Sequence, residues 1–174
     1  MNSNEVKTET NSYLTFRLGD ETFAANVTKV LNILEMTKIT KVPKAPTYMK
    51  GVINLRGSVL PLVDTRIKFG MSETIFSTNT CILVLDLILN GESVKVGALV
   101  DSVQEVLEIG EDQIQPPPSI GTKFKSDFIE GMAKVGEDFV MLLDVEQIFS
   151  TDEIVMIKGA SDNVSTNDSD NDKK

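Results

Sequence analysis

The sequence predicts a mainly β fold built from two related small barrels, with only short helices. Three observations support this prediction. Apolar and polar residues alternate over several short runs, such as Tyr13–Leu18. Residues that favour tight turns separate these runs, among them Asn90-Gly91, a strong signal for a two-residue hairpin. Two blocks of sequence also recur in the same order, which indicates an internal duplication.

Strand signals follow one another along most of the chain. The expected strands are Tyr13–Leu18, Thr22–Asn26, Gly51–Leu55, Val59–Val63, Thr80–Leu89, Ser93–Val100 and Phe139–Leu143. Gly19-Asp20, Arg56–Ser58 and Asn90-Gly91 should turn the chain between neighbouring strands. Pro61 lies inside one of the runs. Because proline has no backbone N–H, that strand is expected at a sheet edge or at a bulge.

Helix signals are few and short. They cover Asp64–Phe69, Asp144–Phe149 and about residues 151–157. Asp64 and Asp144 are expected to act as N-caps, because a carboxylate at that position accepts the free N–H groups of the first turn.

The internal repeat consists of two pairs of matching blocks. Gly51 to Asp64 has the same length as Gly131 to Asp144, at an offset of 80 residues. Upstream, the pattern Val27-x-x-Val30-x-x-Ile33-Leu34-Glu35 is echoed by Val100-x-x-Val103-x-x-Val106-Leu107-Glu108, at an offset of 73. Two copies of a five-strand unit predict two barrels, near residues 12–75 and 79–150, because closed barrels leave no sheet edge exposed.

The two ends of the chain differ from the middle. Residues 1–11 are polar, and residues 158–174 are rich in Ser, Asn and Asp, so both segments are expected to be disordered. Nothing resembles a signal peptide, and the longest apolar run, Ile82–Leu89, is too short to span a bilayer. We therefore expect a cytoplasmic protein.

Composition argues against an enzyme. The 174 residues include no histidine and one cysteine, Cys81, and the formal net charge is −9. Without histidine the chain lacks the usual general base and the commonest metal ligand, and it shows no metal-ligand spacing and no phosphate-binding loop. Neither a metal nor a cofactor is expected. The negative charge disfavours binding to nucleic acid. A protein that holds other proteins remains as the leading class.

The charge is also unevenly distributed. Residues 1–79 carry 10 bases and 7 acids, whereas residues 80–157 carry 4 bases and 15 acids. A basic half joined to an acidic half suits docking between surfaces of opposite sign. An ordinary solvated surface explains the counts equally well, since charges close in sequence need not form a patch.

The motif Gly51-Val-Ile-Asn54-Leu-Arg56-Gly57, followed by Pro61 and Asp64-Thr-Arg66, resembles the GxxNLRGxxxPxxDxR signature of CheW domains, the coupling proteins of bacterial chemotaxis. Val100–Leu107 and Ile114–Pro118 are similar to a second characteristic stretch of that family. The resemblance covers about residues 12–157. It implies a single CheW-like domain of two intertwined, five-stranded SH3-like barrels, with a short helix near residues 151–157.

The resemblance also implies a function. CheW proteins are non-enzymatic adaptors that connect the cytoplasmic tips of chemoreceptors to the regulatory domain of the histidine kinase CheA, in arrays at the membrane. A coupling protein of a non-flagellar chemosensory pathway is the alternative within the family. Two other classes fit less well. An oligonucleotide-binding β-barrel needs basic and aromatic residues on a strand face, and a small hydrolase needs paired catalytic groups.

The resemblance implies that receptor helices bind in a groove between the two barrels. Such a groove is expected to be an apolar channel with polar anchors at its rim. The matching positions here are Val30, Ile33, Val103 and Val106. The alternative is that these residues face the core, the commoner fate of valine. Arg56 is the first candidate for a polar contact, because a guanidinium in a turn has no role in a core.

Further candidates are expected to shape the backbone or to provide a polar contact. Asn54 should shape the turn through its own backbone, and Gly51 and Gly57 are expected for backbone reasons. The family typically has Glu at position 32, where this chain has Asn32, so a carboxylate contact is lost. Glu35, three residues further on, is the candidate to replace it.

Overall fold

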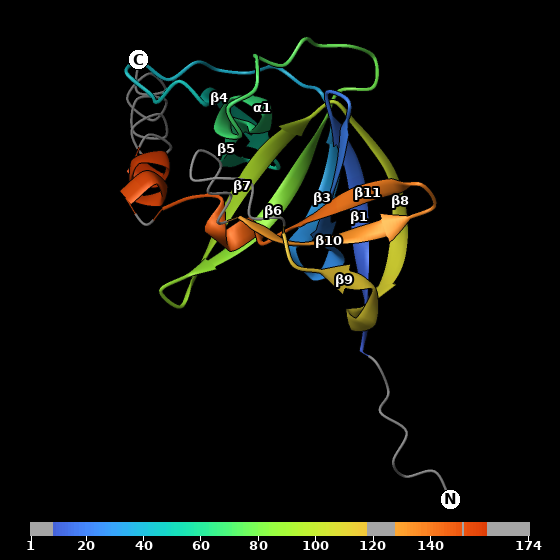
Figure 1. Ribbon diagram of the computed structural model, residues 1–174. Coiled ribbons are helices and arrows are strands. Elements are labelled where there is room, and N and C mark those ends of the chain that lie inside the picture. The colour runs from blue at the N-terminus through green and yellow to red at the C-terminus, as the bar shows by residue number, and fades with distance from the viewer. Residues whose placement is uncertain (1–8, 118–127, 151, 160–174) are drawn as a thin grey trace, which may run out of the picture.

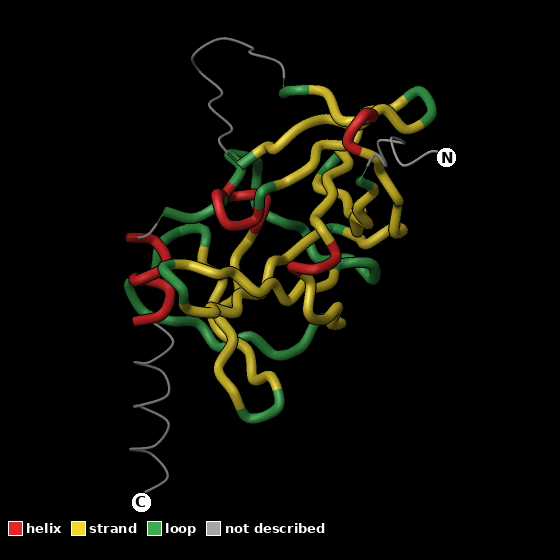
Figure 2. The backbone as a smooth tube through the Cα atoms, turned by 90° about the horizontal axis from the view of Figure 1, so that it is seen from below, coloured by secondary structure: helices red, strands yellow, loops and turns green. Residues whose placement is uncertain are grey.

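The computed structural model describes residues 9–117, 128–150 and 152–159. Strands dominate this part of the chain and form two curled sheets, which short helical turns connect (Figures 1 and 2). The predicted mainly β fold class is confirmed. Among the described residues, no helix is long and apolar enough to cross a membrane.

One sheet, here called barrel B, has the strand order β3-β6-β7-β5-β4. Its strands are β3 (Val30–Glu35), β4 (Met49–Leu55), β5 (Ser58–Asp64), β6 (Cys81–Leu89) and β7 (Glu92–Val100). All five therefore come from one continuous stretch of chain. The β6–β7 hairpin turns at Asn90 and Gly91, whose φ angles of 53° and 79° fit the expected two-residue turn.

The other sheet, barrel A, has the order β8-β1-β2-β11-β10-β9. Its strands are β1 (Thr10–Leu18), β2 (Glu21–Asn26), β8 (Ser102–Gly110), β9 (Ile114–Gln115), β10 (Ile129–Val135) and β11 (Asp138–Leu143). The N-terminal hairpin thus shares a sheet with strands from the other end of the chain, and barrel B is inserted between β2 and β8 (Figure 1).

This topology corrects the predicted division of the chain near residues 12–75 and 79–150. The N-terminal hairpin belongs with the second sequence copy, and the β6–β7 hairpin belongs with the first. The reason is long-range parallel pairing. β2 pairs with β11, and β7 pairs with β5. Each barrel therefore closes with a hairpin that local sequence signals do not assign to it.

The two barrels repeat each other's strand register. In barrel B, Leu62 lies opposite Gly97, and in barrel A, Leu142 lies opposite Ala24. These positions are related by the same offsets of 80 and 73 residues that relate the sequence blocks. The duplication seen in the sequence is therefore also a duplication of pairing.

The helical elements are short, as expected. They are η1 (Val27–Lys29), α1 (Thr65–Lys68), η2 (Glu111–Gln113), η3 (Val145–Gln147) and a helix over residues 152–159. Asp64 caps α1 by accepting from the Arg66 N–H at 3.1 Å, and Asp144 caps η3 by accepting from the Glu146 N–H at 3.2 Å.

Two expectations about the chain ends and one strand need correction. β1 begins at Thr10, which pairs with Gly110, so the segment expected to be disordered to residue 11 ends earlier. Lys158 belongs to the last helix, and residues 1–8 and 160–174 lie outside the described residues. The edge position expected for the Pro61 strand is wrong, because β5 lies between β4 and β7. Proline is accommodated since β7 pairs with β5 only from Leu62 onward.

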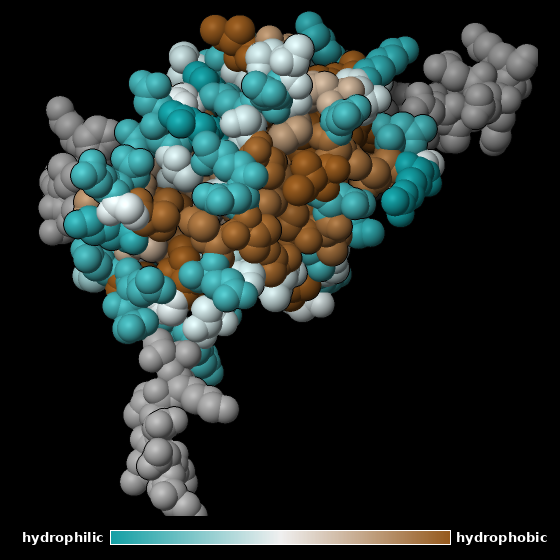
Figure 3. Space-filling view, turned by 90° about the vertical axis from the view of Figure 1, so that its right-hand side faces the viewer, coloured by the Kyte–Doolittle hydropathy of each residue, from teal (hydrophilic) through white to brown (hydrophobic). Residues whose placement is uncertain are grey.

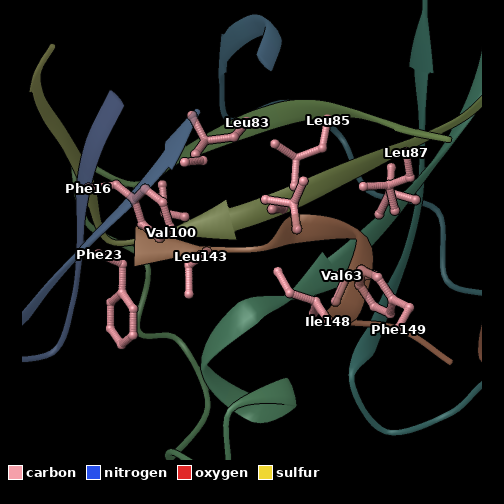
Figure 4. Close-up of a cluster of buried hydrophobic side chains, with 14 of the residues drawn as sticks. Phe16, Phe23, Val63, Leu83, Leu85, Leu87, Val100, Leu143, Ile148 and Phe149 are labelled. Carbon is pink, nitrogen blue, oxygen red and sulfur yellow. The ribbon is translucent and has the colours of Figure 1, made fainter. Parts of the chain in front are cut away.

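Buried side chains gather in three clusters. A small cluster in each barrel consists only of residues from that barrel. The largest cluster takes residues from both barrels and from the segment around η3, and it therefore joins them. Figure 4 shows Phe16 and Phe23 of barrel A, Leu83 and Leu85 of barrel B, and Ile148 together in this cluster. Burying this shared surface fixes the barrels as one body.

Candidate functional site

Arg56 lies at the tip of the β4–β5 hairpin. Arg56 and Gly57 form a two-residue turn with φ angles of 52° and 86°, closed by the pairing of Leu55 with Ser58. The Asn54 Oδ1 atom accepts from the Gly57 N–H at 2.7 Å, so this side chain shapes the turn. The arrangement presents the arginine side chain to solvent.

The left-handed conformation of Arg56 has a backbone cost of roughly 1–2 kcal/mol for a residue with a Cβ atom. The corresponding position in the repeat, 80 residues later, is Gly136, with φ 64°. Glycine adopts this conformation without strain. One barrel thus has glycine where the other retains a strained arginine, so backbone geometry does not explain the choice of arginine.

Arg56 lines a depression of about 360 Å³ in barrel B. The other lining residues come from all five strands of barrel B and are Leu31, Asn32, Leu55, Ser58, Val59, Leu60, Val84 and Lys95. The structure therefore brings together Arg56 and Asn32, two residues that the sequence singled out separately. Sequence reasoning missed Lys95. Its alternation with Val94 and Val96 places it on the opposite face of β7, but only the long-range pairing of β7 brings that face to the depression.

Val30 and Ile33 lie on one face of β3, although they are three positions apart and a regular strand would place them on opposite faces. Val30 is opposite Leu85, and Ile33 is opposite Leu83, so three steps on β3 match two steps on β6. A β-bulge in β3 supplies the extra residue. The spacing of three that the sequence repeats is therefore the signature of a bulge.

The same irregularity occurs in β8. Val103 lies opposite Phe16, and Val106 lies opposite Leu14, so again three steps match two. The bulges sit at equivalent places in the repeat. They turn Val103 and Val106 toward the same face of barrel A.

Burial divides the four residues into two pairs. Val30 and Val103 are half-buried and pack against the cluster that joins the barrels. Ile33 and Val106 are about 50% and 56% exposed. Val30 and Val103 therefore face the core, which was the alternative interpretation of these valines. Ile33 and Val106 are exposed and free to contact a partner. Figure 3 shows a continuous apolar area on the side where β8 and the β10–β11 hairpin lie.

Comparison with known proteins identifies the family. The sequence model of the protein family described as "CheW-like domain" matches residues 12–153 of this chain. The chain belongs to the CheW-like family. It is 32% identical over 145 residues to "Chemotaxis protein CheW" of Klebsiella aerogenes, covering 83% of this chain and 85% of that protein. It is 34% identical over 140 residues to "Chemotaxis protein CheW" of Rhizobium meliloti, covering 80% and 88%.

A solved CheW structure has the same fold. The chain superposes on the scaffolding protein TtCheW from Thermoanaerobacter tengcongensis with a TM-score of 0.73 and 29% sequence identity. The match covers 83% of this chain and 96% of the other. The predicted resemblance to the CheW family is therefore confirmed, together with its fold.

Within this CheW-like domain, Glu35 does not replace the glutamate expected at position 32. Asn32 lies opposite Val84 and Glu35 lies opposite Cys81, with no irregularity between them. Three regular steps along a strand reverse the face, so Glu35 points away from Asn32. Glu35 is exposed at the end of β3 and is not one of the residues that line the depression. The depression therefore contains no carboxylate at this position.

Gly51 and Asp64 hold the hairpin that carries Arg56. A Cβ atom on Gly51 would lie 2.2 Å from the Thr40 carbonyl oxygen, and its φ is 147°. Asp64 is fully buried, and besides capping α1 its carboxylate accepts from the Thr74 N–H and Oγ1 at 3.1 and 2.7 Å. Both residues are structural.

Cys81 and the described acidic side chains are the remaining groups that could be reactive. Burial raises the pKa of the Cys81 thiol, which disfavours the thiolate. Within residues 9–117, 128–150 and 152–159, no three Cys, Asp or Glu side chains gather as a metal site would require. The geometry is suited to protein contact.

Proposed function

We propose that this CheW-like chain is a non-enzymatic adaptor that couples the cytoplasmic tips of chemoreceptors to the histidine kinase CheA. The observation that carries the proposal is Arg56, kept in a strained turn at the rim of a depression where the repeat has glycine. A guanidinium presented in this way is suited to a directed polar contact with another protein.

Apolar residues complete the receptor site. Ile33 and Val106 are exposed ends of two apolar strips that begin at the half-buried Val30 and Val103. A helix of the receptor tip would lay its apolar face against these side chains, while Arg56 fixes its register. Binding of receptors in this way would recruit the chain to receptor arrays at the membrane.

Charge supports a second contact, with the regulatory domain of CheA. Lys41 and Lys44 are exposed in the segment before β4, and Lys44 adopts a φ of 59°. Lys50, in contrast, is engaged with Glu73. The free lysines of this segment would meet an acidic surface of the kinase and accelerate association.

The test is reconstitution of the ternary complex. Membranes containing receptors are mixed with CheA and the full chain, and co-sedimentation and kinase autophosphorylation are measured. The wild-type chain should sediment and stimulate the kinase. Arg56→Asn, which suits the left-handed turn, should lose at least about tenfold in receptor affinity, since it removes a charged contact.

Lys134→Gln is the matched control, because Lys134 is an exposed lysine of the β10–β11 hairpin that does not line the depression with Arg56. It should behave like wild type. Failure of the wild-type chain to bind either partner would overturn the proposal. The pair Lys41→Glu and Lys44→Glu should weaken CheA binding alone, and unchanged affinity at low salt would refute the kinase contact.

A further inference from the structure

The depression in barrel B has an unusual charge. Two of its lining residues are cations, Arg56 and Lys95, and none is an acid. Some cations of the described residues are paired, for example Arg66 with Asp101 and Lys68 with Glu153, whereas others, such as Lys41 and Lys44, are not. Arg56 and Lys95 form no ion pair with any described residue.

Asp86 is a candidate partner for Lys95, because it lies directly opposite on β6. Its carboxylate accepts from the Ser93 hydroxyl, and Asp86 does not line the depression. None of the residues that line the depression supplies a negative charge to Arg56 or Lys95. Asn32 and Ser58 add neutral polar groups beside them.

The cations are surrounded by apolar side chains. Leu31, Leu55 and Val59 line the same depression, and Leu31 is 45% exposed. A ligand that fills it must bring an anionic group and apolar atoms together. Only two cations are present, in a chain of net charge −9, so an extended polyanion such as nucleic acid does not match.

We infer that the depression binds an Asp or Glu side chain of a partner protein, held between Arg56 and Lys95 and flanked by apolar residues of the same segment. The inference rests on the proposed function, in which that segment belongs to a receptor tip. Arg56 offers paired N–H donors to the carboxylate, and Lys95 supplies the second positive charge. Lys95 is then a specificity-determining residue that selects acidic segments.

The first test measures receptor affinity of the full chain with charge variants. Lys95→Glu and Asn32→Glu place a carboxylate in the depression, and each should weaken binding about tenfold, because like charges then meet. Lys95→Gln should weaken it less. Lys134→Gln is again the control. Wild-type affinity in Lys95→Glu, or tighter binding by Asn32→Glu, would overturn the inference while leaving receptor coupling intact.

A second test does not depend on receptors. Poly-L-glutamate is titrated into the isotope-labelled chain, and the side-chain NMR signals of Arg56 and Lys95 are followed. Both should shift in a saturable, salt-sensitive way, and poly-L-lysine should leave them unchanged. A response to poly-L-lysine, or to inorganic phosphate but not to poly-L-glutamate, would contradict a carboxylate site even if receptor binding itself failed.

Discussion

Arg66 and Asp101 join the two barrels through a charged hydrogen bond of 2.8 Å between Nε and Oδ1. Arg66 belongs to α1, at the end of the β5 strand of barrel B, and Asp101 lies between β7 and β8. The second carboxylate oxygen accepts from the Gly19 N–H at 2.7 Å, in the turn of the N-terminal hairpin. One carboxylate thus holds together segments from both barrels.

This carboxylate should make stability depend on pH. Burial raises the pKa of Asp101. The hydrogen bonds from Arg66 and Gly19 together lower it by more, so the pKa lies below its usual value. The contribution of Asp101 to the free energy of unfolding is therefore complete above its unfolded-state pKa. It is lost as the pH falls through its folded-state pKa. Asp101→Asn should unfold with about 1–3 kcal/mol less free energy near neutral pH. Urea unfolding between neutral and acidic pH tests this, and an equal pH dependence in both proteins would contradict it.

Arg56→Asn should separate stability from binding. Because asparagine tolerates the left-handed conformation better than arginine, the free energy of unfolding should stay equal or rise by up to about 1 kcal/mol. Thermal unfolding measures this change. Arg56→Lys keeps the strain and serves as the comparison. A marked loss of stability in Arg56→Asn would show that the guanidinium supports the fold.

Gly51→Ala should be far more damaging than Gly57→Ala. The added methyl group would collide with the Thr40 carbonyl, whose pairing with Val52 holds the segment before β4. We expect a loss of about 2–4 kcal/mol at Gly51 and about 1 kcal/mol at Gly57, where nothing lies within 4 Å of the new atom. Denaturant midpoints of the two variants provide the measurement, and equal midpoints would argue against the close approach.

Substitution of Val30 should mainly lower stability, whereas substitution of Ile33 should mainly weaken receptor binding. Val30→Ala removes contacts with the cluster between the barrels and should cost about 1 kcal/mol of stability. Ile33→Ser changes a half-exposed side chain and should stay within about 0.5 kcal/mol, yet weaken receptor binding. Unfolding and co-sedimentation of both variants test the division. Intact receptor binding by Ile33→Ser would remove β3 from the proposed site.

Short-range sequence patterns were sufficient to predict the hairpin turn and the helix N-caps. Asn90-Gly91 forms the expected turn, and Asp64 and Asp144 cap the helical turns that follow them. These features depend on a few neighbouring residues. The assignment of hairpins to barrels failed because the parallel pairing of β2 with β11 joins residues more than a hundred positions apart. No local pattern specifies such a partner.

The candidate site shows the same limit. Arg56 could be predicted because a turn motif surrounds it. The local signals assign no strand to residues 30–35, so they do not show that Asn32 and Glu35 lie on opposite faces. Lys95 is missed because its neighbours in the depression come from other strands. The bulges at Val30 and Val103 were visible as a spacing of three, but that spacing has a structural meaning only once the segments are known to be strands.

The insertion of barrel B between β2 and β8 has a consequence for synthesis of the protein. During translation, every strand of barrel B has been made once residue 100 is added, so this barrel can close early. The hairpin made first must wait for β8 and β11, and until then both of its edges lack partners. The β1–β2 hairpin is therefore made before barrel B but completes its sheet only after barrel B has been made, and until then its open edges are exposed to wrong pairing.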